Sequence, residues 1–68
     1  MGLTEILERR RIRILDFFKT NKGEFATGKI ASLTGMNYWI AESALEDLEK
    51  EGKLILKVVG NAKYWKKK

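Results

Sequence analysis

The sequence predicts a small α+β domain in which three helices and a short strand precede a C-terminal β-hairpin. Apolar residues recur at helical spacing as far as Gly52, which follows the last periodic position. Beyond Gly52 the pattern changes to the β-branched and apolar run 54–59, and Gly60-Asn61 is a two-residue hairpin signal. The 68 residues leave room for one domain with a modest core. Residues 1–68 are therefore expected to fold as a single unit.

The first helix is expected to begin at Thr4, a suitable N-cap, and to end in the turn-forming segment 19–23. Ile12 and Phe17 lie away from its main apolar stripe, which favours a place at the edge of the core or on a dimer surface. The side chains expected to point inward are those of Leu7, Ile14, Leu15 and Phe18.

Four arginines interrupt the apolar pattern of this first helix, at positions 9, 10, 11 and 13. Two interpretations remain open. The cluster could bind phosphates, or it could form a solvated helix face that is paired with the acids Glu5, Glu8 and Asp16.

A helix-turn-helix unit is predicted over residues 27–52. Thr27 is expected to cap its first helix, and Gly35 supplies the positive φ that a tight turn needs. Asn37 is expected to cap a second helix over residues 38–51. The apolar positions expected to close a core are Ile30, Ala31, Leu33, Met36, Ile40, Ala41, Ala44, Leu45 and Leu48.

Phe25-Ala26 is expected to form a brief edge strand that pairs with the C-terminal hairpin. A two-residue turn at Gly60-Asn61 fixes the hairpin register, and a slip of one or two residues is the alternative. The expected register pairs Val59 with Ala62, Val58 with Lys63 and Leu56 with Trp65.

Charge is segregated along the chain, which has a formal net charge of +5. Residues 1–41 carry +3, residues 42–52 carry −4, and residues 53–68 carry +6. Such segregation indicates a polyanionic partner for the basic parts, and nucleic acid is the commonest one. The alternative is that the lysines only keep a small protein soluble.

The composition excludes several classes of site. Without Cys or His there are no disulfides, thiolate metal sites or common zinc sites, and Ser32 and Ser43 lack a nearby base. We therefore expect neither an enzyme nor a cofactor. No apolar run reaches the length of a membrane span and no signal peptide opens the chain, so a cytoplasmic protein is expected. The absence of Cys, His, Gln and Pro favours a thermophilic source.

Two segments, Lys29–Met36 and Ala44–Leu54, carry a resemblance to a known family. They are similar to the "IA-x-x-TG" end of the second helix and to the "AL-x-x-LE-x-EG-x-L" passage of the winged helix-turn-helix family. Tyr64-Trp65 resembles the aromatic close of the family's second wing strand. The resemblance implies a helix-turn-helix over residues 27–52 and a β-hairpin wing over residues 53–66.

In this family the third helix enters the major groove of DNA and the wing lies along the backbone or minor groove. The resemblance therefore implies sequence-specific binding of double-stranded DNA by a small transcriptional regulator. Asn37 could be an N-cap, a base contact or both, and Trp39 could instead be an aromatic at the edge of the core. The residues implied to contact DNA are Lys29, Asn37, Tyr38, Trp39, Glu42, Ser43, Lys57, Lys63 and Lys66.

Two departures from the family keep other partners open. Glu42 and Glu46 stand where the family often has polar or basic residues, and carboxylates repel phosphates. No long helix follows the wing, so a homodimer would have to use the first helix or the wing. The alternative function is a module that binds a partner protein through Tyr38, Trp39 and Ile40, and RNA binding is a third option.

Overall fold

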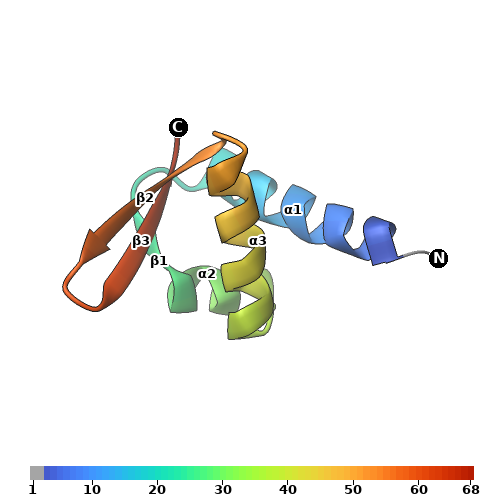
Figure 1. Cartoon of the computed structure of the whole chain (residues 1–68), viewed down its shortest axis with the longest axis horizontal. Coiled ribbons are helices and arrows are strands. Elements are labelled where there is room, and N and C mark those ends of the chain that lie inside the picture. Colours follow the sequence, from blue (N-terminus) through green and yellow to red (C-terminus); the bar gives the residue numbers. More distant parts are fainter. Residues whose placement is uncertain (1–2) are drawn as a thin grey trace.

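Helices and strands follow one another in the predicted order (Figure 1). The computed structural model describes the backbone of residues 3–68 and the side chains of residues 8–68. Its elements are α1 (Leu3–Thr20), β1 (Phe25–Ala26), α2 (Thr27–Thr34), α3 (Tyr38–Lys50), β2 (Leu54–Val59) and β3 (Ala62–Lys67). This is the predicted α+β architecture. Among the described residues, no helix combines the length and apolar character needed to cross a membrane.

The strands form one antiparallel sheet in the order β1-β3-β2, so β3 is central. β1 pairs with β3 as the sequence predicts, and the hairpin projects away from the helices toward its turn (Figure 1). The predicted register is confirmed without a slip, because a two-residue turn leaves little freedom in the pairing. Its observed pairs include Val59 with Ala62, Val58 with Lys63 and Leu56 with Trp65.

Trp65 lies at the centre of the core, where its side chain is 0% exposed. It packs with buried side chains from all three helices, and its indole Nε1 donates a hydrogen bond of 2.8 Å to Oγ1 of Thr27. Thr27 is itself buried, in the first turn of α2. The prediction that Thr27 caps this helix is wrong: Ala26 holds the N-cap position, and the Thr27 hydroxyl is used as the acceptor for the indole.

The two helices of the helix-turn-helix unit end where the sequence predicts, just before a glycine with positive φ. Gly35 has φ of 71°, and the N–H of Met36 donates to the carbonyl of Ala31. Gly52 has φ of 79° and directly follows the last turn of α3, where the N–H of Lys53 donates to the carbonyl of Leu48. Both are Schellman-type ends that satisfy otherwise unpaired helix carbonyls.

Two apolar residues, Leu33 and Phe17, differ from the predicted core. Leu33 is 55% exposed because α2 buries the adjacent face, whose members are Thr27, Ile30, Ala31 and Thr34. Phe17 is only 8% exposed and packs edge-on against Phe18 and Phe25, so the buried stripe of α1 is wider than predicted. Ile12 is 49% exposed, in agreement with its predicted place away from the main apolar stripe. α1 begins at Leu3, ahead of the predicted cap Thr4, and the side chains of Thr4 and Leu7 lie outside the described residues.

We expect the Thr27→Val variant to unfold more readily than the wild type. Valine keeps the shape of threonine but removes the acceptor of the buried Trp65 indole, which costs about 1–3 kcal/mol. Urea denaturation followed by circular dichroism measures the loss. Ser32→Ala is the matched control, because Ser32 is exposed on the same helix and its loss should change stability by less than about 0.5 kcal/mol. Equal stability of Thr27→Val and the wild type would contradict the assigned role.

Candidate nucleic-acid interface

Helix α3 turns one face to the core and presents another to solvent. It buries Ala41, Ala44, Leu45 and Leu48. On the other side the side chain of Trp39 is 72% exposed, and its ring meets that of Tyr38 edge-on with centroids 5.3 Å apart. Ser43, one turn after Trp39, is also exposed. The interpretation of Trp39 as an aromatic at the edge of the core is therefore wrong.

Asn37 caps α3, because its Oδ1 accepts a hydrogen bond of 2.8 Å from the backbone N–H of Trp39. The side chain is nevertheless exposed, at the end of the helix that carries the two aromatic rings. Capping fixes where the residue lies without burying it. The geometry is thus compatible with both predicted roles of Asn37.

Two of the acids of α3, Glu42 and Glu46, lie close to the wing. Glu46 Oε2 is 3.7 Å from Nζ of Lys63, and Glu42 shares a shallow pocket with Tyr38 and Lys63. Both glutamates are half-buried. The basic wing therefore offsets part of the negative charge of α3, although an ion pair that solvent still reaches contributes only about 0–1 kcal/mol.

The predicted wing lysines do not share one face of the sheet. Side chains alternate along a strand, so Lys63 shares the face of Trp65, whereas Lys57 and Lys66 lie on the opposite face. Lys57 Nζ is 3.6 Å from Oε1 of Glu24. Lys66, like Lys29 on α2, is exposed and forms no ion pair with the part of the chain that the structure describes. The lysines thus surround the hairpin instead of lining one side of it.

Two of the four arginines of α1 have structural contacts. Arg13 Nη1 donates a hydrogen bond of 3.1 Å to the carbonyl of Thr34, at the end of α2. Arg11 is paired with Glu51 just beyond α3, and also with Glu8 at 3.6 Å. These contacts hold α1 against the helix-turn-helix unit. The Arg11–Glu8 pair is one that the sequence predicts for a paired helix face, whereas the contacts of Arg11 with Glu51 and of Arg13 with Thr34 were not predicted.

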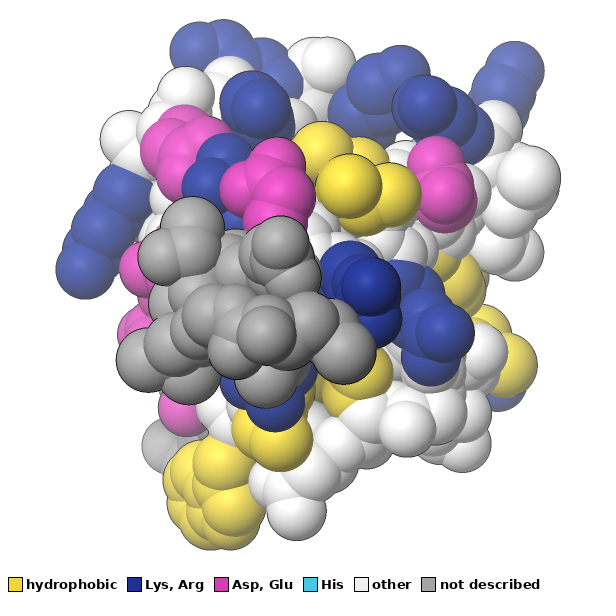
Figure 2. Space-filling view, turned by 90° about the vertical axis from the view of Figure 1, so that its right-hand side faces the viewer, with side chains coloured by type: hydrophobic (Ala, Val, Ile, Leu, Met, Phe, Trp, Pro, Cys, Tyr) yellow, Lys and Arg dark blue, Asp and Glu magenta, His cyan; other side chains and the backbone are white. Residues whose placement is uncertain are grey.

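The other two arginines, Arg9 and Arg10, line an open cleft of about 610 Å³ between α1 and the turn before α3. Asp16 also reaches this cleft, but its carboxylate pairs with Lys19 at 3.6 Å. Figure 2, which looks onto the side where α1 begins, shows Lys and Arg side chains gathered near the middle of the face beside apolar ones. Spacing within one helix could not reveal this cleft, because its opposite wall comes from a distant segment.

Comparison with known proteins links the architecture to a family. No protein-family model and no curated protein matches the chain. A crystal structure of a possible transcriptional regulatory protein from Mycobacterium bovis (fragment 1–100) is similar, with 34% identity and a TM-score of 0.75 over 85% of this chain and 60% of that one.

A solution NMR structure is similar as well, with 34% identity and a TM-score of 0.73 over 85% of this chain and 52% of that one. It is described as the homodimeric winged helix-turn-helix DNA-binding domain (fragment 1–100) of a possible ArsR-family transcriptional regulator from Mycobacterium bovis. This chain thus spans about half to three-fifths of the structures it matches. The element order, the wing and these likenesses show that the chain has the winged helix-turn-helix fold.

Proposed function

We propose that this chain binds double-stranded DNA without catalysing a reaction and regulates transcription. The observation that carries the proposal is the exposed face at the start of α3, with Tyr38 and Trp39 outward, beside a basic hairpin. A similar domain from Mycobacterium bovis is described as DNA-binding and as part of a possible transcriptional regulator. In this proposal α3 enters the major groove and the wing lies against the backbone.

Residues at the start of α3 supply the sequence readout. Asn37 and Ser43 offer hydrogen bonds to base edges, and Tyr38 and Trp39 add apolar contact in the groove. Glu42 can accept a hydrogen bond from the amino group of cytosine. Because the groove contacts come from one short surface, the proposal predicts a compact half-site.

Lysines supply the attraction to phosphates. Lys66 and Lys29 are exposed and ready to bind, whereas Lys57 and Lys63 must exchange Glu24 and Glu46 for a phosphate. This exchange costs little free energy, because exposed ion pairs contribute only about 0–1 kcal/mol. Four such contacts would give log affinity a salt slope of roughly −3.6 on B-form DNA.

The experiment that tests the proposal begins with selection of bound duplexes from a random pool. Fluorescence anisotropy then measures the affinity of the winning duplex against a scrambled duplex of the same composition. We expect the selected duplex to bind at least about tenfold more tightly, as one or two good base contacts provide. No enrichment, together with no binding of any duplex at low salt, would contradict DNA binding.

The Trp39→Ala variant should lose DNA affinity without losing stability. Its side chain is 72% exposed, so truncation should change the free energy of unfolding by less than about 0.5 kcal/mol. Loss of a groove contact should weaken binding by about 1–3 kcal/mol, measured by anisotropy. Leu33→Ala removes an exposed apolar side chain from α2 and is the control that should bind normally. Equal DNA affinities of the two variants would show that Trp39 is not part of the DNA interface.

We also propose that two copies associate through α1 when they bind DNA. Ile12 on this helix is 49% exposed, and one of the similar domains is described as homodimeric. The selected duplex reports this directly, because the symmetry of a dimer requires two inverted half-sites. A single half-site and a monomeric mass in sedimentation would exclude the dimer.

A module that binds a partner protein is the second candidate function. The exposed edge-to-face pair of Tyr38 and Trp39 favours it, because aromatic residues dominate the energetics of protein interfaces. Reversing the charge of Lys57 and Lys63 separates the candidates. The change should weaken DNA binding at least about 50-fold near 0.1 M salt and should leave an aromatic protein contact intact.

A further inference from the structure

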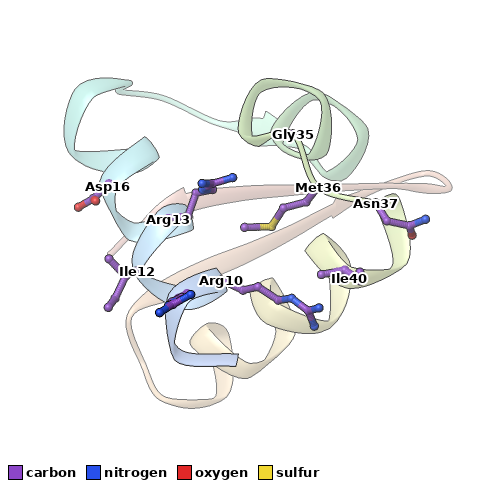
Figure 3. Close-up of a pocket in the computed structure, with 9 residues that line it drawn as sticks. Arg10, Ile12, Arg13, Asp16, Gly35, Met36, Asn37 and Ile40 are labelled. Carbon is purple, nitrogen blue, oxygen red and sulfur yellow. The ribbon is translucent and has the colours of Figure 1, made fainter. Parts of the chain in front are cut away.

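The open cleft between α1 and the turn before α3 combines positive charge with apolar side chains. We call it the arginine cleft and define it by Arg9, Arg10 and Arg13 on one wall and Met36, Asn37 and Ile40 on the other. In Figure 3, Arg10 and Arg13 project from α1, and Met36 and Ile40 approach from the opposite side. Met36 and Ile40 are half-buried, so this wall offers an apolar surface that solvent still reaches.

The charge in this cleft is predominantly positive. Asp16 lies at the edge of the arginine cleft, but in Figure 3 its side chain points away from the cleft, and it pairs with Lys19. Arg13, which lines the cleft, uses one nitrogen to bind the carbonyl of Thr34, and this bond leaves its other N–H groups available. Within the described residues, Arg9 and Arg10 form no ion pair.

We propose that the arginine cleft binds a small organic anion that has an apolar body and one carboxylate, sulfonate or phosphate group. Guanidinium groups match such anions through paired N–H donors and stack on flat apolar groups. The volume of about 610 Å³ is typical of a small-molecule site. A bare inorganic ion would leave Met36 and Ile40 unused, and a neutral apolar compound would leave the arginines unused.

The position of the cleft couples its occupant to α3. Asn37 lines the cleft and caps α3, and Ile40 lies in the next turn. A smaller cavity of about 210 Å³ shares Arg10 and Ile40 with the cleft and is also lined by Trp39 and Ser43. A bound anion therefore places negative charge next to the surface assigned to DNA and should weaken DNA binding. This coupling rests on the proposed function, whereas binding of the anion does not.

The test uses 8-anilinonaphthalene-1-sulfonate as the probe and the full chain without DNA. Titration followed by probe fluorescence and by backbone amide NMR shifts should show one saturable site, with the largest shifts at Met36, Asn37 and Ile40. The neutral analogue N-phenyl-1-naphthylamine and inorganic phosphate should each bind at least about tenfold more weakly, because each uses only half of the site. Shifts centred elsewhere, or equal binding of phosphate and probe, would overturn the proposal.

Charge variants locate the anion. Arg10→Glu should weaken probe binding by about tenfold or more, while Lys22→Glu makes the same charge change in an exposed loop and should have no effect. Circular dichroism shows whether each variant is folded, and Arg10→Gln replaces Arg10→Glu if the reversal unfolds α1. Equal probe affinity of the folded Arg10 variant and the wild type would contradict the site.

A DNA arm separates this proposal from the proposed function. Saturating probe should weaken binding of the selected duplex several-fold, and the duplex should weaken the probe by the same factor. If no duplex binds at all, the proposed function fails and the probe titration alone still decides the cleft. If Arg10→Glu abolishes DNA binding and the probe does not bind, the cleft holds a DNA phosphate and the proposal is wrong.

Discussion

Replacing Trp65 with alanine is expected to unfold the domain almost completely. The side chain is 0% exposed, on the central strand of the sheet, and it contacts the core while its indole binds Thr27. Truncating a buried tryptophan costs about 3–5 kcal/mol. The whole free energy of unfolding of a natural domain is only about 0.05–0.15 kcal/mol per residue, so this loss is comparable with the total for so short a chain.

Chemical denaturation followed by circular dichroism measures the effect of this change. Trp39→Ala is the matched control, because it makes the same substitution at a side chain that is 72% exposed. It should shift the free energy of unfolding by less than about 0.5 kcal/mol. Similar losses in the two variants would show that Trp65 does not organise the core. Retention of the native fold by Trp65→Ala would also show that Trp65 does not organise the core.

Reversing two wing charges, as Lys57→Glu with Lys63→Glu, is expected to weaken DNA binding at least about 50-fold near 0.1 M salt. Each lost phosphate contact removes roughly 0.9 from the magnitude of the salt slope, so the slope should fall by about 1.8. The change also places new carboxylates next to Glu24 and Glu46, which now pair with these lysines. Repulsion between the carboxylates at both positions adds to the loss of DNA affinity.

The control for this reversal is Lys19→Glu with Lys22→Glu. Lys19 lies in the last turn of α1 and Lys22 in the following loop, so the net charge changes equally while the wing and α3 stay intact. Fluorescence anisotropy across a salt series measures both double variants. Equal losses of affinity would mean that DNA responds only to net charge and that the wing is not a contact surface.

Local sequence signals predicted the parts of the fold that depend on neighbouring residues. The register of β2 and β3 follows from the Gly60-Asn61 turn and the alternation of the strands. Asn37 and Gly52 were predicted correctly at the two ends of α3, because caps depend on a residue's own chemistry. The family resemblance placed the exposed face of α3, although the sequence left the exposure of Trp39 open.

Contacts between distant segments explain what the sequence alone did not predict. The indole of Trp65 and the hydroxyl of Thr27 are 38 residues apart, and Arg13 and the carbonyl of Thr34 are 21 apart. No local pattern pairs such groups. The arginine cleft was missed for the same reason. The division of the wing lysines between two faces of the sheet, by contrast, could have been predicted from the sequence. The predicted register together with strand alternation already implied it.

The most direct test of DNA binding is the salt dependence of affinity for the selected duplex. Log affinity plotted against log salt concentration should be linear, with a slope of roughly −3.6 for contacts from Lys29, Lys57, Lys63 and Lys66. Binding that is absent at low salt would contradict the account, and so would an affinity that does not change with salt.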